Sequence, residues 1–179
     1  AAAMGVKLSF SPMPFAELLP ALLSGKVDMV ISGMSISPDR NLKVAFVGPY
    51  FVSGKSIVTR AEKADALSSP ADLAAPDVKI VALEGSTSQT LIKTVIPAAQ
   101  LQTTTDYDKA LALVIEGKVD AMVADFPFCA LAVLRNPEKK LATLDEPFTF
   151  EPLGIALPAD DPLLINWVQN FLMTLEGSD

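Results

Sequence analysis

The segment ALLSGKVDMVIS (residues 21–32) recurs in outline as ALVIEGKVDAMVAD (residues 112–125). Each copy predicts a helix that ends at a glycine, Gly25 or Gly117, then the triplet Lys-Val-Asp, then a buried strand. The first copy runs on into SGMSISPDR, which ends in the cation Arg40, whereas the second ends in the anion Asp125. Two similar lobes, one offering a cation and the other an anion, favour a small zwitterion held between them.

The composition is that of a globular protein, since 50% of the 179 residues are hydrophobic and 20% are charged. Such a chain can bury one sizeable core or two small ones. The net charge of −7 and the lack of a basic block argue against a nucleic-acid or anionic-membrane surface. No apolar run approaches the roughly 20 residues of a membrane span, and AAAMGVK (residues 1–7) shows no leader pattern.

Histidine is absent, and Cys129 is the single cysteine. Histidine-based triads, histidine metal sites and an internal disulfide are therefore excluded. The sequence predicts neither a metal site nor a cofactor.

Short apolar runs alternate with amphipathic stretches along most of the chain, a pattern typical of α/β proteins with a mostly parallel sheet covered on both faces. Strands or extended segments are predicted at residues 7–10, 29–32, 53–60, 78–83, 101–104, 119–124 and 148–157. Helices are predicted at residues 15–24, 88–95, 107–116, 126–134 and 162–175.

Two further short helices carry clear start signals. Ser37 can cap a helix that opens with Pro38 at its first position. Residues 69–72 read Ser-Pro-Ala-Asp, which predicts a capping box. In both cases the capping side chain bonds a backbone group only three residues away, so the helix starts can be predicted without knowledge of the tertiary fold.

The candidate site residues follow predicted strands, where parallel α/β sheets place their ligands. Ser32, Gly33 and Ser35 follow one strand, residues 85–88 follow another, and Asp125 ends a third. A ligand carboxylate needs convergent donors, which hydroxyls, backbone N–H groups at a helix start and a guanidinium supply.

Each candidate also has a structural interpretation. Arg40 can be a surface residue in the first turn of a helix, and Phe15 lies in an apolar helical stripe that is typical of a core. Residues 85–88 can be only a strand-to-helix turn with a cap. Asp125 is well placed to cap the helix that opens with Phe126 and Pro127.

The longest distinctive stretch is PFAELLPALLSGKVDMVISGMSISPDRNLKVAFVGPYFVSGKSIV (residues 14–58). Together with GSTSQ (residues 85–89) and Asp125, it resembles the periplasmic solute-binding proteins of polar amino-acid ABC transporters, known as bacterial extracellular solute-binding proteins of family 3. The resemblance implies the type II periplasmic binding fold, an α/β structure of two lobes, each a mostly parallel sheet flanked by helices.

The resemblance assigns the ligand's α-carboxylate to Arg40, helped by the hydroxyl and N–H of Ser35. It also places Thr87 on this carboxylate, with Ser86 beside it.

The remaining assignments concern the amino group and the carbon chain of the ligand. Asp125 matches the family's acceptor for the α-amino group, and Gly33 matches a carbonyl acceptor for the same group. Ser32 matches a position that often contacts the ligand, and Phe15 matches an aromatic that packs against its carbon chain.

The two expected passages between the lobes divide the chain into lobe 1, residues 1–58 plus 153–179, and lobe 2, residues 59–152. Hinge strands are expected near residues 55–61 and 150–156. The family pattern extends beyond both ends of this sequence, so lobe 1 is expected to be incomplete and the chain truncated at both ends.

The implied function is extracytoplasmic binding of an L-amino acid, with delivery to an ABC transporter permease and no chemistry on the ligand. A polar or neutral amino acid is favoured, because Leu83, at a position that can read the ligand's side chain, is apolar. The implied location is periplasmic or extracellular, with a lipid anchor as one option and no leader in this chain.

Three alternatives stay open on the same fold. A dehydratase resembling cyclohexadienyl or arogenate dehydratases would need a general acid in the cleft, for which Glu17 and Glu84 are the nearby candidates. A ligand-sensing domain of a receptor would share the binding site but not the permease. The third is a degenerate, non-binding fragment that is held together as a homodimer through the exposed edge of the incomplete lobe 1.

Overall fold

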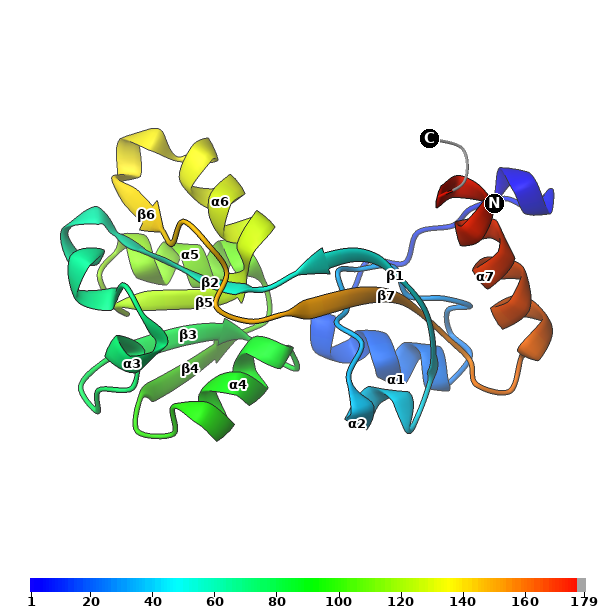
Figure 1. Cartoon of the computed structure of the whole chain (residues 1–179), viewed down its shortest axis with the longest axis horizontal. Helices are drawn as coiled ribbons and strands as arrows, with labels where there is room; N and C mark the ends of the chain where they lie inside the picture. The colour runs from blue at the N-terminus through cyan, green and yellow to red at the C-terminus, as the bar shows by residue number, and fades with distance from the viewer. Residues whose placement is uncertain (177–179) are drawn as a thin grey trace.

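Two lobes joined by extended crossings make up the computed structural model, which describes residues 1–176 (Figure 1). The strands are β1 (Ala45–Ser53), β2 (Lys55–Arg60), β3 (Lys79–Leu83), β4 (Gln100–Thr104), β5 (Ala121–Asp125), β6 (Leu141–Thr143) and β7 (Glu151–Leu157). The α-helices are α1 (Leu18–Leu23), α2 (Pro38–Asn41), α3 (Pro70–Leu73), α4 (Thr87–Val95), α5 (Tyr107–Ile115), α6 (Phe126–Arg135) and α7 (Pro162–Glu176). Short 3₁₀ turns lie at Ala2–Met4, Phe15–Glu17, Ala61–Lys63, Asp65–Leu67 and Pro137–Lys139.

Lobe 2 contains a five-stranded sheet in the order β4-β3-β5-β2-β6. Strands β4, β3 and β5 are parallel, whereas β2 runs antiparallel to both of its neighbours. Alternate residues face opposite sides of this sheet, so Met122 packs with α5 and α6 while Val123 packs with α3 and α4. Both faces are therefore buried, which explains the continuous apolar runs of the central strands.

Lobe 1 is built around a two-stranded sheet in which β1 and β7 run antiparallel. Apolar residues of α1 pack in one cluster with Val30 and Val44, and those of α7 pack in another with Val47 and Leu157. The α/β class and the two lobes are thus as the sequence predicts. None of the helices within residues 1–176 is long and apolar enough to cross a membrane.

The predicted mostly parallel sheet is wrong for lobe 1, where the described strand pairs are antiparallel. Residues 7–10 are exposed and form no strand, and residues 29–32 contribute only an isolated antiparallel bridge between Val30 and Ala156. An apolar run becomes a strand only where a neighbouring backbone completes the ladder. In the described part of lobe 1, only Val30 of these two segments meets such a neighbour.

The predicted helix starts and stops are confirmed. The Ser37 hydroxyl accepts the N–H of Arg40, and Ser69 forms a complete capping box with Asp72. Gly25 and Gly117 follow their helices in the left-handed region, with φ of 69° and 71°.

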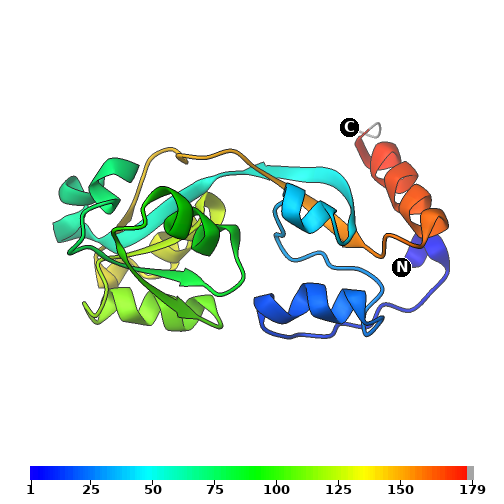
Figure 2. The same ribbon diagram turned by 90° about the horizontal axis from the view of Figure 1, so that it is seen from below.

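Both crossings run along one side of the molecule, so the lobes face each other beneath them (Figure 2). The first crossing passes from β1 to β2 through Gly54, and the second leads into β7. They are tied together where the Lys55 N–H donates to Thr149 Oγ1 at 2.8 Å and the Phe148 N–H donates to the Lys55 carbonyl at 2.8 Å.

The residue limits of the lobes remain a prediction. Because β2 pairs with β5 from Lys55 onward, we propose that the first crossing lies at residues 53–55 rather than 55–61. Residues 177–179 of the predicted range 153–179 lie outside the described residues.

Candidate functional site

A cavity of about 520 Å³ lies between the two lobes and is lined by residues of both. Its size falls in the range of small-molecule sites. Most of the predicted binding residues line it: Phe15, Ser32, Gly33, Ser35, Ser86, Thr87 and Asp125. The parallel strands β3 and β5 end at this cavity, and so the sheet positions the residues that follow them.

Arg40, in α2, lies beside the cavity at the contact between the lobes. Its Nη1 donates to the Ser35 carbonyl at 2.8 Å, and its Nη2 donates to the Gly85 carbonyl of the opposite lobe at 3.0 Å. The guanidinium carbon lies 5.6 Å from the centre of the Phe15 ring. Burial lowers the pKa of Arg40, and the charges of Glu151 and Asp125 oppose that shift. The guanidinium is therefore a partly desolvated cation with donors to spare, suited to a carboxylate.

Hydroxyl groups continue this contact between the lobes. Ser35 Oγ of lobe 1 lies 3.1 Å from Thr87 Oγ1 of lobe 2. Thr87 Oγ1 in turn donates to Glu151 Oε2 at 3.2 Å, at the start of β7. Since Thr87 donates to Glu151, its oxygen accepts from Ser35 in this arrangement. Both hydroxyls can turn toward a carboxylate that enters the cavity.

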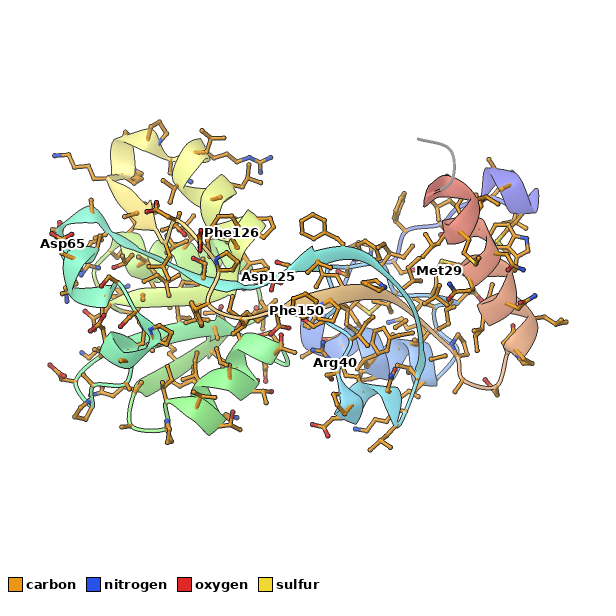
Figure 3. All side chains as sticks on the ribbon, viewed as in Figure 1. Met29, Arg40, Asp65, Asp125, Phe126 and Phe150 are labelled. Carbon is orange, nitrogen blue, oxygen red and sulfur yellow. The ribbon has the colours of Figure 1, made fainter. Side chains whose placement is uncertain are left out.

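Asp125 ends β5 and is held by a buried cation. Lys55, whose side chain is 2% exposed, places its Nζ 2.6 Å from Asp125 Oδ1 and 3.8 Å from Glu151 Oε2. Asp125 occupies the N-cap position of α6, yet its side chain makes no capping hydrogen bond. The Asp125 carboxylate is thus paired with Lys55 at the cavity and does not cap the helix. Figure 3 shows Asp125 on lobe 2 and Arg40 on lobe 1, on opposite sides of the space between the lobes.

No role in the site is predicted from the sequence for Lys55 or Glu151. Lys55 opens a strand whose next four residues are all buried, with the apolar Ile57 and Val58 at its centre, and a charge in such a place needs a partner. The partner Asp125 lies directly opposite in the β2–β5 register, 70 positions along the chain. Such a register is a property of the folded sheet.

The other predicted residues have mixed surroundings. Phe15 lines the cavity and also packs against the core of α1, so its packing role is confirmed and its contact with a ligand stays a prediction. The Gly33 N–H donates to the Tyr50 hydroxyl at 3.2 Å, and Ser32 is exposed at the cavity wall. Ser86 caps α4 by accepting the N–H of Gln89 at 3.2 Å, and a ligand contact would compete with this bond.

The acids proposed for dehydratase chemistry do not line the cavity. Glu17 and Glu84 are both exposed to solvent. A general acid must reach the group that it protonates. Neither glutamate meets that condition in the described structure.

Comparison with known proteins gives the family of the chain. Residues 1–179 match the family model of bacterial extracellular solute-binding proteins, family 3. The glutamate-binding protein GluB of Corynebacterium efficiens is 32% identical over 83% of this chain and 51% of its own length. The arginine-binding protein 1 of Escherichia coli is 28% identical over 97% of the chain and 71% of its length. A cyclohexadienyl dehydratase of Pseudomonas aeruginosa is 24% identical over 90% of the chain and 60% of its length.

Solved structures give the same fold. An ancestral amino-acid-binding protein, described as a precursor of cyclohexadienyl dehydratase, superimposes with a TM-score of 0.90 at 38% identity, over 99% of this chain and 75% of that one. An ancestral arginine-binding protein bound to glutamine gives 0.93 at 33% identity, over 99% and 77%. These similarities confirm the predicted two-lobed fold.

The chain spans about half the length of the first curated relatives it matches, 51% in each case. The family match nonetheless covers every residue of the chain. The chain belongs to the bacterial extracellular solute-binding proteins of family 3.

Proposed function

We propose that this chain binds an L-amino acid in the cavity between its lobes, without chemistry on the ligand. One observation carries the proposal: donors for a carboxylate and an acceptor for an ammonium lie on opposite sides of the same space. Arg40, Ser35 and Thr87 supply the donors, and Asp125 supplies the acceptor. A zwitterionic amino acid has both groups on one carbon, so it can join the two lobes.

The proposed contacts follow from the hydrogen-bonding groups. The α-carboxylate takes N–H groups of Arg40 and the hydroxyls of Ser35 and Thr87. The α-ammonium takes the carboxylate of Asp125 and the carbonyl of Gly33, and Phe15 packs against the carbon chain. Each charged hydrogen bond contributes about 1.5–3 kcal/mol net. A ligand that contacts both lobes forms all of these bonds only when the lobes are closed. It therefore stabilises the closed arrangement by the free energy of the bonds that the open arrangement lacks.

The charges around the cavity favour a polar or neutral ligand. Arg40 and Lys55 balance Asp125 and Glu151, so these four side chains carry no net charge. A ligand of zero net charge leaves this balance intact, whereas a charged ligand side chain would need a partner of its own. Relatives of the chain are named for glutamate, histidine, arginine and glutamine, and so the family accommodates several classes.

Delivery to an ABC transporter permease is the proposed purpose of this binding, and the periplasm or the extracellular side is the proposed location. The family name and the transporter relatives support both. Attachment by a lipid anchor and a role as a receptor's sensing domain remain predictions.

The homodimer through lobe 1 also stays a prediction. Within the described residues β1 pairs only with β7, and residues 48–52 of β1 are exposed. Sedimentation equilibrium of the chain tests this directly.

The test of the binding function is a thermal-shift panel of the twenty amino acids, repeated by calorimetry for each hit. Binding is expected to raise the melting temperature of the unchanged chain. Arg40→Ala and Asp125→Ala should each abolish the shift. The exposed residues Arg135 and Asp160 provide matched controls, and their alanine variants should keep it. A shift that survives both Arg40→Ala and Asp125→Ala would refute the proposed site.

Dehydratase activity is the competing function, and the Pseudomonas aeruginosa relative is the observation in its favour. We propose that the chain lacks this activity, because Glu17 and Glu84 lie outside the cavity and Asp125 is already paired with Lys55. Incubation with prephenate and with arogenate, followed by detection of aromatic product, separates the two functions.

A further inference from the structure

A stacked aromatic pair forms part of the cavity wall in lobe 2. Tyr107 opens α5 just after β4, and Phe128 lies in the first turn of α6 just after β5. Their ring centres are 4.0 Å apart and their planes differ by 25°. Both rings line the cavity. The stack holds the Tyr107 ring in one orientation, because each ring is anchored at the start of a different helix.

The hydroxyl of Tyr107 makes no hydrogen bond with any residue of the described chain, residues 1–176. Tyr50, on the lobe 1 side of the same cavity, differs because its hydroxyl accepts the Gly33 N–H at 3.2 Å. Among residues 1–176 no buried side-chain polar atom lacks a partner, so the unbonded Tyr107 hydroxyl reaches solvent, and its residue lines the cavity where a ligand can meet it. Burial first, and then the charge of Asp125, raises the pKa of Tyr107 far above its ordinary value. The hydroxyl therefore keeps its proton and can both donate and accept.

Within residues 1–176, the charged side chains that line the cavity are already paired. Asp106, the neighbour of Tyr107, caps α5 by accepting the Lys109 N–H at 2.8 Å and pairs with the Lys109 ammonium at 2.8 Å. The apolar side chains of Leu83 and Met13 line the same cavity. The hydroxyl of Thr105, which also lines the cavity, is bonded to Asp106 and Lys109, so it is less free than the Tyr107 hydroxyl to bind a ligand side chain.

We propose that Tyr107 determines the side-chain specificity of this protein, by a hydrogen bond from its hydroxyl to an uncharged polar group on the ligand. The ligand class is then an amino acid with an amide at the end of a short apolar stem, such as glutamine. This inference rests on the proposed amino-acid binding. It assigns to Tyr107 a contact with the ligand that the sequence motifs do not indicate.

The test compares L-glutamine with L-norleucine by isothermal titration of the unchanged chain and of Tyr107→Phe. The two ligands share the α-groups and a similar stem, but norleucine lacks the amide. Tyr107→Phe keeps the stacked ring and removes only the hydroxyl. We expect it to weaken glutamine binding about tenfold and norleucine binding less than about twofold. Tyr50→Phe removes a hydroxyl that contacts the backbone of Gly33, and it should weaken both ligands by the same factor.

The possible outcomes distinguish failure of this inference from failure of the proposed binding function. An equal loss for both ligands in Tyr107→Phe would mean that the hydroxyl meets the α-groups, and no loss for either would mean that it meets nothing. Both results overturn the inference and leave amino-acid binding intact. Binding of charged amino acids only would do the same. If none of the twenty amino acids binds to the unchanged chain, the proposed function fails together with the inference.

Discussion

At the scale of single residues, Lys55 is the cation that neutralises the carboxylates of the candidate site. Its ammonium is almost fully buried between the carboxylates of Asp125 and Glu151. A buried charge is tolerated only when it is paired, and removal of one partner leaves the other desolvated and alone. Lys55 thus stabilises the two carboxylates that a ligand ammonium would otherwise have to neutralise unaided.

Lys55→Met is therefore expected to lower the free energy of unfolding by about 3 kcal/mol. Urea unfolding followed by circular dichroism measures the loss. The double variant Lys55→Met/Asp125→Asn should recover part of it, because it removes one of the two unpaired charges. Lys118 is 64% exposed and pairs with Glu116, so Lys118→Met should cost less than about 1 kcal/mol. Equal costs for the buried and the exposed lysine would contradict this account of Lys55.

At the scale of the elements, the first crossing depends on a glycine that has no room for a side chain. A Cβ on Gly54 would lie 2.1 Å from the Thr149 carbonyl oxygen and 2.6 Å from the Pro147 Cβ. Neither neighbour can move independently, since residues 147–149 belong to the second crossing and the Phe148 N–H is bonded to the Lys55 carbonyl. The close approach of the two crossings thus requires glycine at this position.

Gly54→Ala should destabilise the protein by about 3 kcal/mol, because the backbone of one crossing must shift. Gly154→Ala offers a matched comparison within β7. Its Cβ would meet the Ile36 side chain at 2.8 Å, and a side chain can turn away, so we expect a cost of about 1 kcal/mol. Denaturation midpoints of the two variants measure the difference. A smaller cost for Gly54→Ala than for Gly154→Ala would rule out close backbone contact as the constraint.

At the scale of the whole molecule, Arg40 connects the lobes through two backbone carbonyls. One of its N–H groups reaches Ser35 in its own lobe and another reaches Gly85 in the opposite lobe. A lysine has a single ammonium and cannot span both carbonyls as a planar guanidinium does. We therefore expect Arg40 to stabilise the closed arrangement of the lobes in addition to its proposed role in the carboxylate site.

Arg40→Lys is expected to shift the lobe equilibrium toward open by about tenfold, since a charged hydrogen bond contributes about 1.5–3 kcal/mol. Small-angle X-ray scattering should show a larger radius of gyration than for the unchanged chain. Arg60 is the control, because it donates to the carbonyls of Val114 and Val119 within lobe 2. Arg60→Lys should lower the melting temperature without a change in radius. An unchanged radius in Arg40→Lys would show that other contacts hold the lobes together.

Most of the fold could be predicted from the sequence where the signal is local. The caps at Ser37 and Ser69 and the stop at Gly25 act within one turn of helix, so the residues themselves determine them. Strands β2, β3 and β5 of lobe 2 are as predicted because both of their faces are buried, whereas the three-residue strand β6 is not among the predicted strands. The strands expected at residues 7–10 and 29–32 failed because strand formation needs a partner ladder that hydropathy does not reveal.

The sequence by itself determined the α/β class, the two lobes, the helix limits and the residue types that suit a zwitterion. Periodicity, capping signals and charge depend on residues that are close together in the sequence, so they can be recognised without the fold. Only the tertiary structure decided which of these groups meet. The pairing of Lys55 with Asp125, the approach of Thr87 to Glu151 and the stack of Tyr107 on Phe128 join segments far apart in the chain. Such contacts depend on strand register and on the relative position of the lobes, which arise only when the whole chain packs.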